Sequence, residues 1–256
     1  MSTQIQVSFL SRPGGEKLAY LQEKDTGGNV GVTWLGGFKS DMTGTKATAL
    51  AEWARDRDRS YLRFDYFGHG QSTGRFVDGT ISRWRDDALA ALDELCVGPQ
   101  ILVGSSMGAW IALLAALARP EQVKALVLIA PAPDFTEALM WEGFDEKIRT
   151  TLRSVGVYRK PSDYDEPYEI SYGLIEDGRQ HLLLGDTIPL FLPVRILQGM
   201  ADEDVPWRHA MLLAETLASD DVTVSLTKSG DHRLSEPDDI ERLTTTLDKL
   251  LSEHSS

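Results

Sequence analysis

The sequence contains a single cysteine, Cys96, among its 256 residues. An internal disulfide is therefore impossible, and a structural zinc site is not expected because no cluster of cysteine and histidine has the spacing of zinc ligands. We expect neither a metal nor a cofactor. A chain of this length buries about three quarters of the surface that its unfolded form exposes, so one large domain is stable without such crosslinks.

Long hydrophobic segments are also absent. The longest apolar run, residues 109–118, is far too short to cross a bilayer and has the character of a buried helix. Residues 1–7 are polar and alternating, with neither the apolar centre of a secretory signal nor the arginine-rich helix of a transit peptide. These observations predict a cytoplasmic protein without a membrane span.

Basic residues are the minority among the charges. The chain has 26 Lys and Arg against 39 Asp and Glu, a formal net charge of −13. Because such a surface repels polyanions, nucleic acid is not an expected partner. One exception is the stretch 147–160, which has no acidic residue. It is either a solvated helix face or a surface that attracts anionic leaving groups such as glucuronate or a coenzyme thioester; its basic residues are Lys147, Arg149, Arg153, Arg159 and Lys160.

Short apolar runs alternate with helical patterns along most of the chain. Strands are predicted at 5–10, 17–22, 30–35, 61–67, 100–104, 123–130, 194–198 and 222–227, and helices at 43–57, 80–95, 107–118, 206–218 and 237–252. This alternation predicts an α/β fold with a mostly parallel twisted sheet flanked by helices. Ser235 is the expected N-cap of the last helix, with Pro237 in its first turn.

The alternation is interrupted between the strands predicted at 123–130 and 194–198. Residues 131–193 are rich in aromatic and charged residues, glycine and proline. We interpret them as a helical cap inserted into a core formed by residues 1–130 and 194–256. The alternative is an elongated connection without a functional role.

The strongest chemical signal is a G-x-S-x-G motif at residues 104–108, between a predicted strand and a predicted helix. The sharp turn of this motif lifts the serine hydroxyl above the sheet, and it requires small residues two positions before and after the serine. Gly104 and Gly108 satisfy this requirement for Ser106, whereas Val103 would occupy the crowded position for Ser105. The bare motif occurs by chance in about one chain in ten of this length. Its assignment as a catalytic site therefore depends on finding a histidine base and an acid at suitable positions.

A serine nucleophile needs a histidine base and an acid that orients it, and in folds with this motif they follow the serine in the order acid, histidine. The chain offers His181, His209, His232 and His254 after Ser106. Only His232 lies directly beyond a predicted strand and before the last helix, so we predict it as the base.

The acid is expected in the loop after the strand at 194–198. We predict Asp202, with Asp204 as the alternative whose other role would be an N-cap. Asp231 adjoins His232, but neighbouring side chains in an extended loop diverge, so we expect it to be solvated.

The anionic oxygen of the intermediate requires two backbone donors. One is predicted to be the N–H of Met107, the residue after the nucleophile. The other is expected from the loop after the strand at 30–35, where Gly36 and Gly37 allow close approach, and we nominate Phe38. The alternative is a turn that simply requires two glycines.

These segments resemble the α/β-hydrolase superfamily and, more narrowly, the α/β-hydrolase domain-containing protein 10 family of palmitoyl-protein thioesterases and acyl-glucuronide esterases. The resemblance rests on LGGFKSDMTG at 35–44, RFDYFGHGQS at 63–72, GSSMG at 104–108 and APAPDF at 130–135. It implies the same roles for Ser106, Asp202, His232, Phe38 and Met107. It also implies a structural, hydrogen-bonding role for His69. This sequence has Gly36 at the position where many members of the superfamily have histidine.

Together these observations predict a serine hydrolase that cleaves small-molecule acyl esters or acylated proteins through an acyl-enzyme on Ser106. A peptidase or amidase of the same fold is the alternative, and a binding protein on a hydrolase scaffold is a further one. Apolar residues of the cap either line an acyl slot or form the cap's own core: Leu139, Met140, Trp141, Phe144 and the run 182–184.

Overall fold

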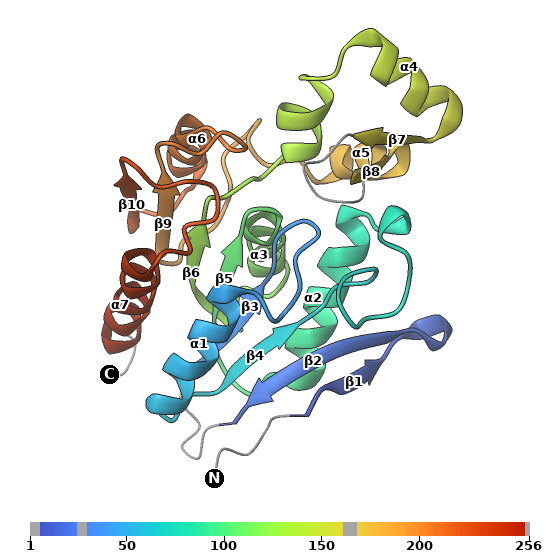
Figure 1. Ribbon diagram of the computed structural model, residues 1–256. Helices are drawn as coiled ribbons and strands as arrows, with labels where there is room; N and C mark the ends of the chain where they lie inside the picture. Colours follow the sequence, from blue (N-terminus) through green and yellow to red (C-terminus); the bar gives the residue numbers. More distant parts are fainter. Residues whose placement is uncertain (1–5, 25–29, 161–167, 254–256) are drawn as a thin grey trace.

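A computed structural model describes residues 6–24, 30–160 and 168–253 (Figure 1). Eight strands form one sheet in the order β1-β2-β4-β3-β5-β6-β9-β10. β2 is antiparallel to both of its neighbours, β1 and β4, and all other neighbouring pairs in the sheet are parallel. The strands are β1 (Ser8–Ser11), β2 (Lys17–Glu23), β3 (Gly31–Leu35), β4 (Tyr61–Phe64), β5 (Gln100–Ser105), β6 (Val123–Ile129), β9 (Val194–Gly199) and β10 (Val222–Thr227).

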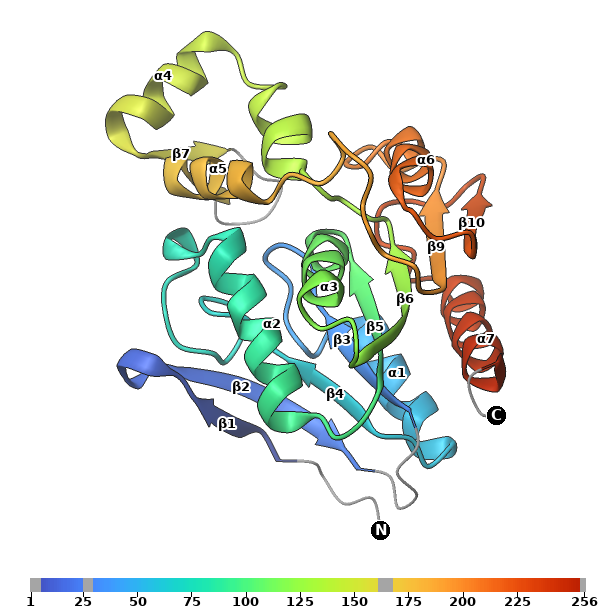
Figure 2. The ribbon, with the colours of Figure 1, turned by 180° about the vertical axis from the view of Figure 1, so that it is seen from behind.

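Helices cover both faces of this sheet. Helices α1 (Thr45–Asp56) and α7 (Pro237–Glu253) lie on one face, and α2 (Ile81–Leu95), α3 (Met107–Ala118) and α6 (Trp207–Thr216) lie on the other (Figure 2). Because successive strand residues point to opposite faces, Ile101 and Val103 join the core cluster under α1 and α7, while Leu102 joins the cluster under α2 and α3. Burial on both faces explains why the central strands are continuously apolar.

The described residues between β6 and β9 form a lobe above the carboxyl ends of the parallel strands (Figure 1). It contains a π-helical turn (Thr136–Trp141), α4 (Glu146–Val155), an antiparallel pair β7 (Val157–Lys160) and β8 (Tyr168–Ser171), α5 (Tyr172–Gly178) and a 3-10 turn (Arg179–His181). The lobe has a small core of its own, formed by Trp141, Leu152, Ile170 and Ile175.

Polar contacts fix the lobe to the helices beneath it. The Asp177 carboxylate accepts the Ser82 N–H at the start of α2 (2.8 Å), where the helix dipole favours a negative charge. A hydrogen bond of 2.7 Å joins Ser82 Oγ and His181 Nε2, and the Trp110 indole of α3 donates to the His181 carbonyl (3.1 Å). The lobe is therefore held over α2 and over α3, the helix that directly follows Ser106.

The predicted fold class is confirmed, and the predicted helix and strand positions agree with the observed ones, with ends that differ by a few residues. The start of the first predicted strand, at residue 5, lies outside the described residues. The β7–β8 pair was not predicted.

The prediction that Ser235 caps α7 was wrong. The Ser235 hydroxyl donates to the Arg233 carbonyl (3.1 Å). At the start of the helix, the Asp239 carboxylate accepts the Glu236 N–H instead (3.3 Å). Across the described ranges, no helix is long and apolar enough to cross a bilayer.

Candidate active site

Ser106 occupies a sharp bend between β5 and α3, with φ 54° and ψ −117°. Positive φ is unfavourable for a residue with a side chain and costs about 1–3 kcal/mol. The flanking glycines make the bend possible. A Cβ on Gly104 would lie 2.5 Å from the Gly108 carbonyl oxygen, and one on Gly108 would lie 2.1 Å from the Leu35 carbonyl oxygen. The steric requirement that singled out Ser106 from Ser105 is thus met in the structure.

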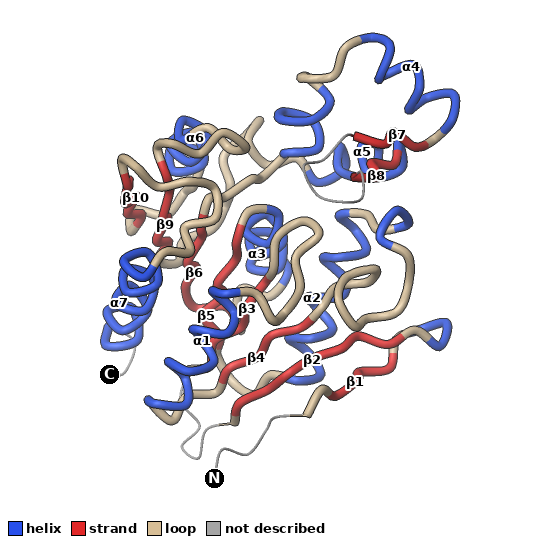
Figure 3. The backbone as a smooth tube through the Cα atoms, viewed as in Figure 1, coloured by secondary structure: helices blue, strands red, loops and turns tan. Residues whose placement is uncertain are grey.

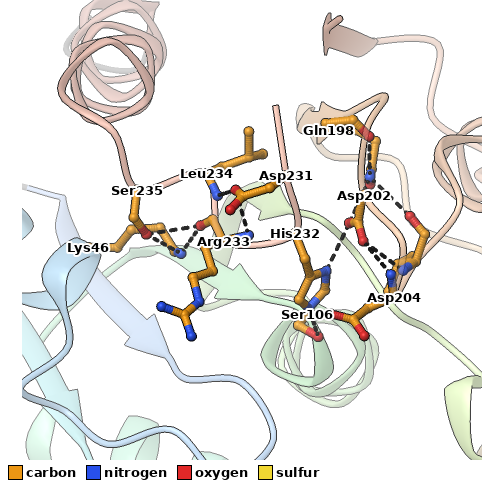
Figure 4. Close-up of polar contacts among 12 residues, drawn as sticks. Lys46, Ser106, Gln198, Asp202, Asp204, Asp231, His232, Arg233, Leu234 and Ser235 are labelled. Carbon is orange, nitrogen blue, oxygen red and sulfur yellow. Dashed lines mark hydrogen bonds and ion pairs between the residues drawn. The ribbon is translucent and has the colours of Figure 1, made fainter. Parts of the chain in front are cut away.

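The loops that follow β3, β5, β9 and β10 gather at one edge of the sheet (Figure 3). This arrangement brings His232, 126 residues away in sequence, next to Ser106 (Figure 4): its Nε2 lies 3.0 Å from Ser106 Oγ. Its Nδ1 lies 2.8 Å from Asp202 Oδ2. Because a carboxylate only accepts, Nδ1 carries the proton and Nε2 is left to accept the serine proton.

Asp202 is held by four donors. Its Oδ1 accepts the N–H groups of Asp204 (2.9 Å) and Val205 (2.8 Å), and its Oδ2 accepts the Gln198 amide (3.1 Å) besides the imidazole of His232. Burial alone would raise the pKa of the Asp202 carboxyl, but these hydrogen bonds and the nearby His232 outweigh it, so the pKa lies below its ordinary value. The carboxylate therefore stays ionised beside the imidazole.

The structure does not bring the other candidates into this position. Asp204 contributes its N–H to Asp202 while its own carboxylate is exposed. His209 Nε2 lies 2.7 Å from the Pro133 carbonyl, and His181 contacts α2 as described above. His254 lies outside the described residues.

Asp202, Asp204 and His232 each place one potential ligand atom within 4.8 Å of the others. Both ring nitrogens of His232 already form hydrogen bonds, to Asp202 and to Ser106. A cation at this position would have to displace one of them, so the donor set fits a proton-transfer chain better than a metal centre.

The loop after β3 lies against the bend at Ser106. A Cβ on Gly37 would be 3.3 Å from the Ser105 carbonyl oxygen and 3.5 Å from Ser106 Cβ. Within the described ranges, no hydrogen bond engages the backbone N–H of Phe38 or that of Met107. Both amides are therefore available to an oxygen bound next to Ser106 Oγ.

His69 supports this loop from below. Its Nδ1–H donates to the Phe67 carbonyl (3.1 Å), and its Nε2 accepts the N–H of Lys39, the residue after Phe38 (3.2 Å). Burial lowers the pKa of His69 to about 4, although the Phe67 carbonyl opposes this shift. The imidazole is therefore neutral above that pH, as its role as an acceptor requires. This is the hydrogen-bonding loop role that the resemblance implied.

Replacing His69 with phenylalanine is expected to lower kcat by about 10- to 100-fold, because the acceptor that fixes the Lys39 N–H is lost and the neighbouring Phe38 amide shifts. The ring itself is retained among Tyr66, Phe76 and Trp84, whose centroids lie 5.0–5.7 Å from that of His69. Steady-state hydrolysis of p-nitrophenyl butyrate measures the effect.

Tyr66→Phe is the matched control. The buried Tyr66 hydroxyl lacks a hydrogen-bond partner among the residues that the structure describes, so its removal from the same aromatic cluster should leave kcat unchanged. Equal losses in both variants would show that packing, and not the acceptor nitrogen, matters.

The proposed acyl-slot residues lie against two hydrophobic cores. Trp141 belongs to the small core of the lobe, and Phe144 packs against that core. Leu139, Leu183 and Leu184 pack against the main core, and the half-buried Met140 packs against both. Leu182 is 43% exposed.

Arginines of the basic stretch contact the lobe itself. Arg149 donates to the Trp141 carbonyl (2.9 Å), Arg153 pairs with Glu146 (3.1 Å) and Arg159 with Glu169 (3.1 Å). The guanidinium carbons of Arg149, Arg153 and Arg179 lie 4.8–5.4 Å from the centroid of the Trp141 ring. These three side chains thus stabilise the fold of the lobe.

Comparisons with known proteins agree with this geometry. Residues 37–171 match the protein family described as serine aminopeptidase, S33. The chain is 41% identical to bovine palmitoyl-protein thioesterase ABHD10, mitochondrial, over 252 residues that cover 98% of this chain and 81% of the relative. A putative hydrolase from Agrobacterium vitis S4 superposes with a TM-score of 0.93 at 41% identity, covering 97% of this chain and 100% of that one. Mouse α/β-hydrolase domain-containing protein 10 gives a TM-score of 0.89 at 39% identity, covering 98% and 100%.

The prediction of a cytoplasmic location was wrong, because the curated relatives that match nearly the whole chain are described as mitochondrial. The composition of seven amino-terminal residues does not determine a compartment.

The predicted superfamily and the predicted hydrolase activity are both supported. An identity of about 40% sustained over 98% of the sequence, together with the close superposition on mouse α/β-hydrolase domain-containing protein 10, shows that this chain is an enzyme of the α/β-hydrolase superfamily and belongs to the family of α/β-hydrolase domain-containing protein 10.

Proposed function

We propose that Ser106, Asp202 and His232 form a catalytic triad that hydrolyses acyl thioesters and esters, palmitoylated protein among them. One observation carries the proposal: an unbroken hydrogen-bond chain of 3.0 Å and 2.8 Å runs from the Ser106 hydroxyl through His232 to Asp202. The acyl class comes from the relatives, which are named palmitoyl-protein thioesterases.

In the proposed acylation step, His232 Nε2 takes the Ser106 proton while Oγ attacks the acyl carbonyl carbon. The carbonyl oxygen becomes an oxyanion, which accepts hydrogen bonds from the Phe38 and Met107 amides. The tetrahedral intermediate then collapses, the bond to the leaving sulfur or oxygen breaks, and His232 returns the proton to that atom. The thiol or alcohol leaves and the acyl group remains on Ser106.

Deacylation repeats the sequence with water. His232 removes a proton from water while the water oxygen attacks the acyl carbonyl carbon. The second intermediate then collapses, the bond between the acyl carbon and Ser106 Oγ breaks, and His232 returns the proton to Oγ, which releases the carboxylic acid and restores the Ser106 hydroxyl. Asp202 fixes the imidazole tautomer and stabilises the imidazolium that forms in each half of the cycle.

The lobe of residues 131–193 would serve as a cap on the core of residues 1–130 and 194–256. Its first turn continues from β6, and Leu139 and Met140 lie where the lobe meets the main core. We propose that this pair forms a wall for the acyl chain. Trp141 and Phe144, which pack inside the lobe, would shape that wall from behind.

An amidase or aminopeptidase activity is the second candidate, favoured by the description of the matched family. Substrates that share one acyl group but differ in the leaving atom separate the two. We expect palmitoyl and butyryl thioesters and esters to be hydrolysed, and the matched amides to be slower by orders of magnitude, because an amine leaves only when protonated. A kcat/KM for the amide that equals or exceeds that of the ester would refute the thioesterase assignment.

A further inference from the structure

Lys46 of α1 reaches the loop that carries His232 (Figure 4). Its Nζ donates to the carbonyl oxygen of Arg233, the residue directly after His232, and also to Ser235 Oγ (3.2 Å). The two segments are 187 residues apart in sequence. The hydrolytic mechanism makes no direct use of this ammonium group.

The carbonyl of Arg233, and not a carboxylate, is the principal partner of this charge. Asp231 and Asp239 influence it through space, yet in the described part of the chain no acidic side chain lies within 4.0 Å of Nζ. Asp239 instead pairs with Arg242 (2.9 Å). A charged donor makes a hydrogen bond roughly twice as strong as a neutral one, so the ammonium restrains this one carbonyl.

Other contacts fix the same turn from the opposite side. The Asp231 carboxylate accepts the N–H groups of Arg233 (3.0 Å) and Leu234 (2.9 Å). Leu234 has φ 44° and is only 4% exposed, packed against the core cluster under α1 and α7. A branched residue holds positive φ only where its surroundings impose it. Lys46 and Asp231 therefore restrain the carbonyl and the amide of one residue, immediately beyond the imidazole.

We propose that Lys46 is a positioning residue for His232, holding the Arg233 carbonyl so that Nε2 stays within hydrogen-bond reach of Ser106. This inference rests on the proposed function, because it concerns the base of that reaction. Lys46 does not touch the substrate or the reacting atoms, and its effect passes through the peptide that follows His232.

The position of Lys46 also connects activity to alkaline pH. Burial lowers the pKa of the Lys46 ammonium to about 8, while the charges of Asp231 and Asp239 raise this pKa and the charge of Arg233 lowers it. Arg242 and Lys46 line one small cavity, so the guanidinium of Arg242 also faces this group. Above this pH the amine is neutral and the charge-assisted bond weakens. We expect kcat to decline with a midpoint near pH 8, above the rise that a histidine base produces at lower pH.

Lys46→Met tests the proposal, with Lys249→Met on the exposed face of α7 as the matched control. We expect Lys46→Met to lower kcat by about 10- to 100-fold, the loss typical of a slightly misplaced catalytic group, with KM unchanged and the alkaline decline abolished. Lys249→Met should behave as the wild type. A Lys46→Met variant that folds and keeps the kcat of the control would overturn the proposal.

Lys46→Arg keeps the test decisive if the methionine variant does not fold. A guanidinium stays charged far above pH 8 and can donate to the Arg233 carbonyl in place of the ammonium group. We expect the decline near pH 8 to disappear in this variant, and a decline that stays there would contradict the proposal. Failure of the underlying function is recognised separately, because in that case Ser106→Ala would also retain activity.

Discussion

Ser106→Ala should lower kcat for p-nitrophenyl butyrate by about 10⁶-fold, the loss seen when the nucleophile of a serine hydrolase is removed. In the proposed cycle this hydroxyl attacks the carbonyl carbon next to the Phe38 and Met107 amides. Among the described residues its hydrogen-bond partner is His232, and we expect the substitution to leave the backbone of the bend in place. The variant should therefore fold with nearly the wild-type Tm, measured alongside kcat.

Ser105→Ala is the matched control for this variant. Ser105 ends β5 and is buried, one residue before the bend. Because the flanking glycines bracket Ser106, this second variant should keep its activity. Activity retained in Ser106→Ala and lost in Ser105→Ala would reverse the assignment of the nucleophile.

Asp202→Asn should lower kcat by about 10⁴-fold, although it is nearly the same size as the native residue. The backbone N–H groups of Asp204 and Val205 cannot reorient and require an acceptor at the Oδ1 position, whereas the Gln198 side chain can turn its unpartnered Oε1 toward the new group. The Asn oxygen should therefore face the two N–H groups, and its NH₂ should face His232. Nδ1 must then accept, which moves the ring proton to Nε2 and removes the base that Ser106 needs. kcat and KM for the butyrate ester measure the effect.

Asp204→Asn distinguishes the two acidic candidates. The exposed Asp204 side chain can be neutralised while its backbone N–H still donates to Asp202. We expect kcat to change by less than about tenfold, since an exposed charge near the site is largely screened. If Asp204→Asn lost as much activity as Asp202→Asn, the role of orienting His232 would have to be shared by both carboxylates.

Several features of the fold and of the candidate site could be predicted because local rules determine them. The bend at Ser106 could be predicted because, of the two adjacent serines, only this one has glycine both two positions before and two positions after it. Helix α3 has the predicted bounds, Met107–Ala118. His232 and Asp202 could be chosen because the ends of parallel strands meet at one edge of the sheet, which places loops distant in sequence side by side.

Other contacts could not be predicted, since they depend on side chains brought together only by packing. Lys46 lies in a helix with no sequence signal that links it to residue 233. Ser235 has the residue type of an N-cap, but the turn at Leu234 directs its hydroxyl toward Arg233 instead. For His69, the loop motif implied hydrogen bonding, but the contact with Lys39 became visible only in three dimensions.

The most direct test of Ser106 as the nucleophile is the site of covalent labelling by a fluorophosphonate ester, located by peptide mass spectrometry. We expect one adduct on Ser106, formed rapidly in the wild type, slowly in His232→Gln and not at all in Ser106→Ala. An adduct on Ser105 or on another residue, or full ester hydrolysis without labelling of Ser106, would contradict this assignment.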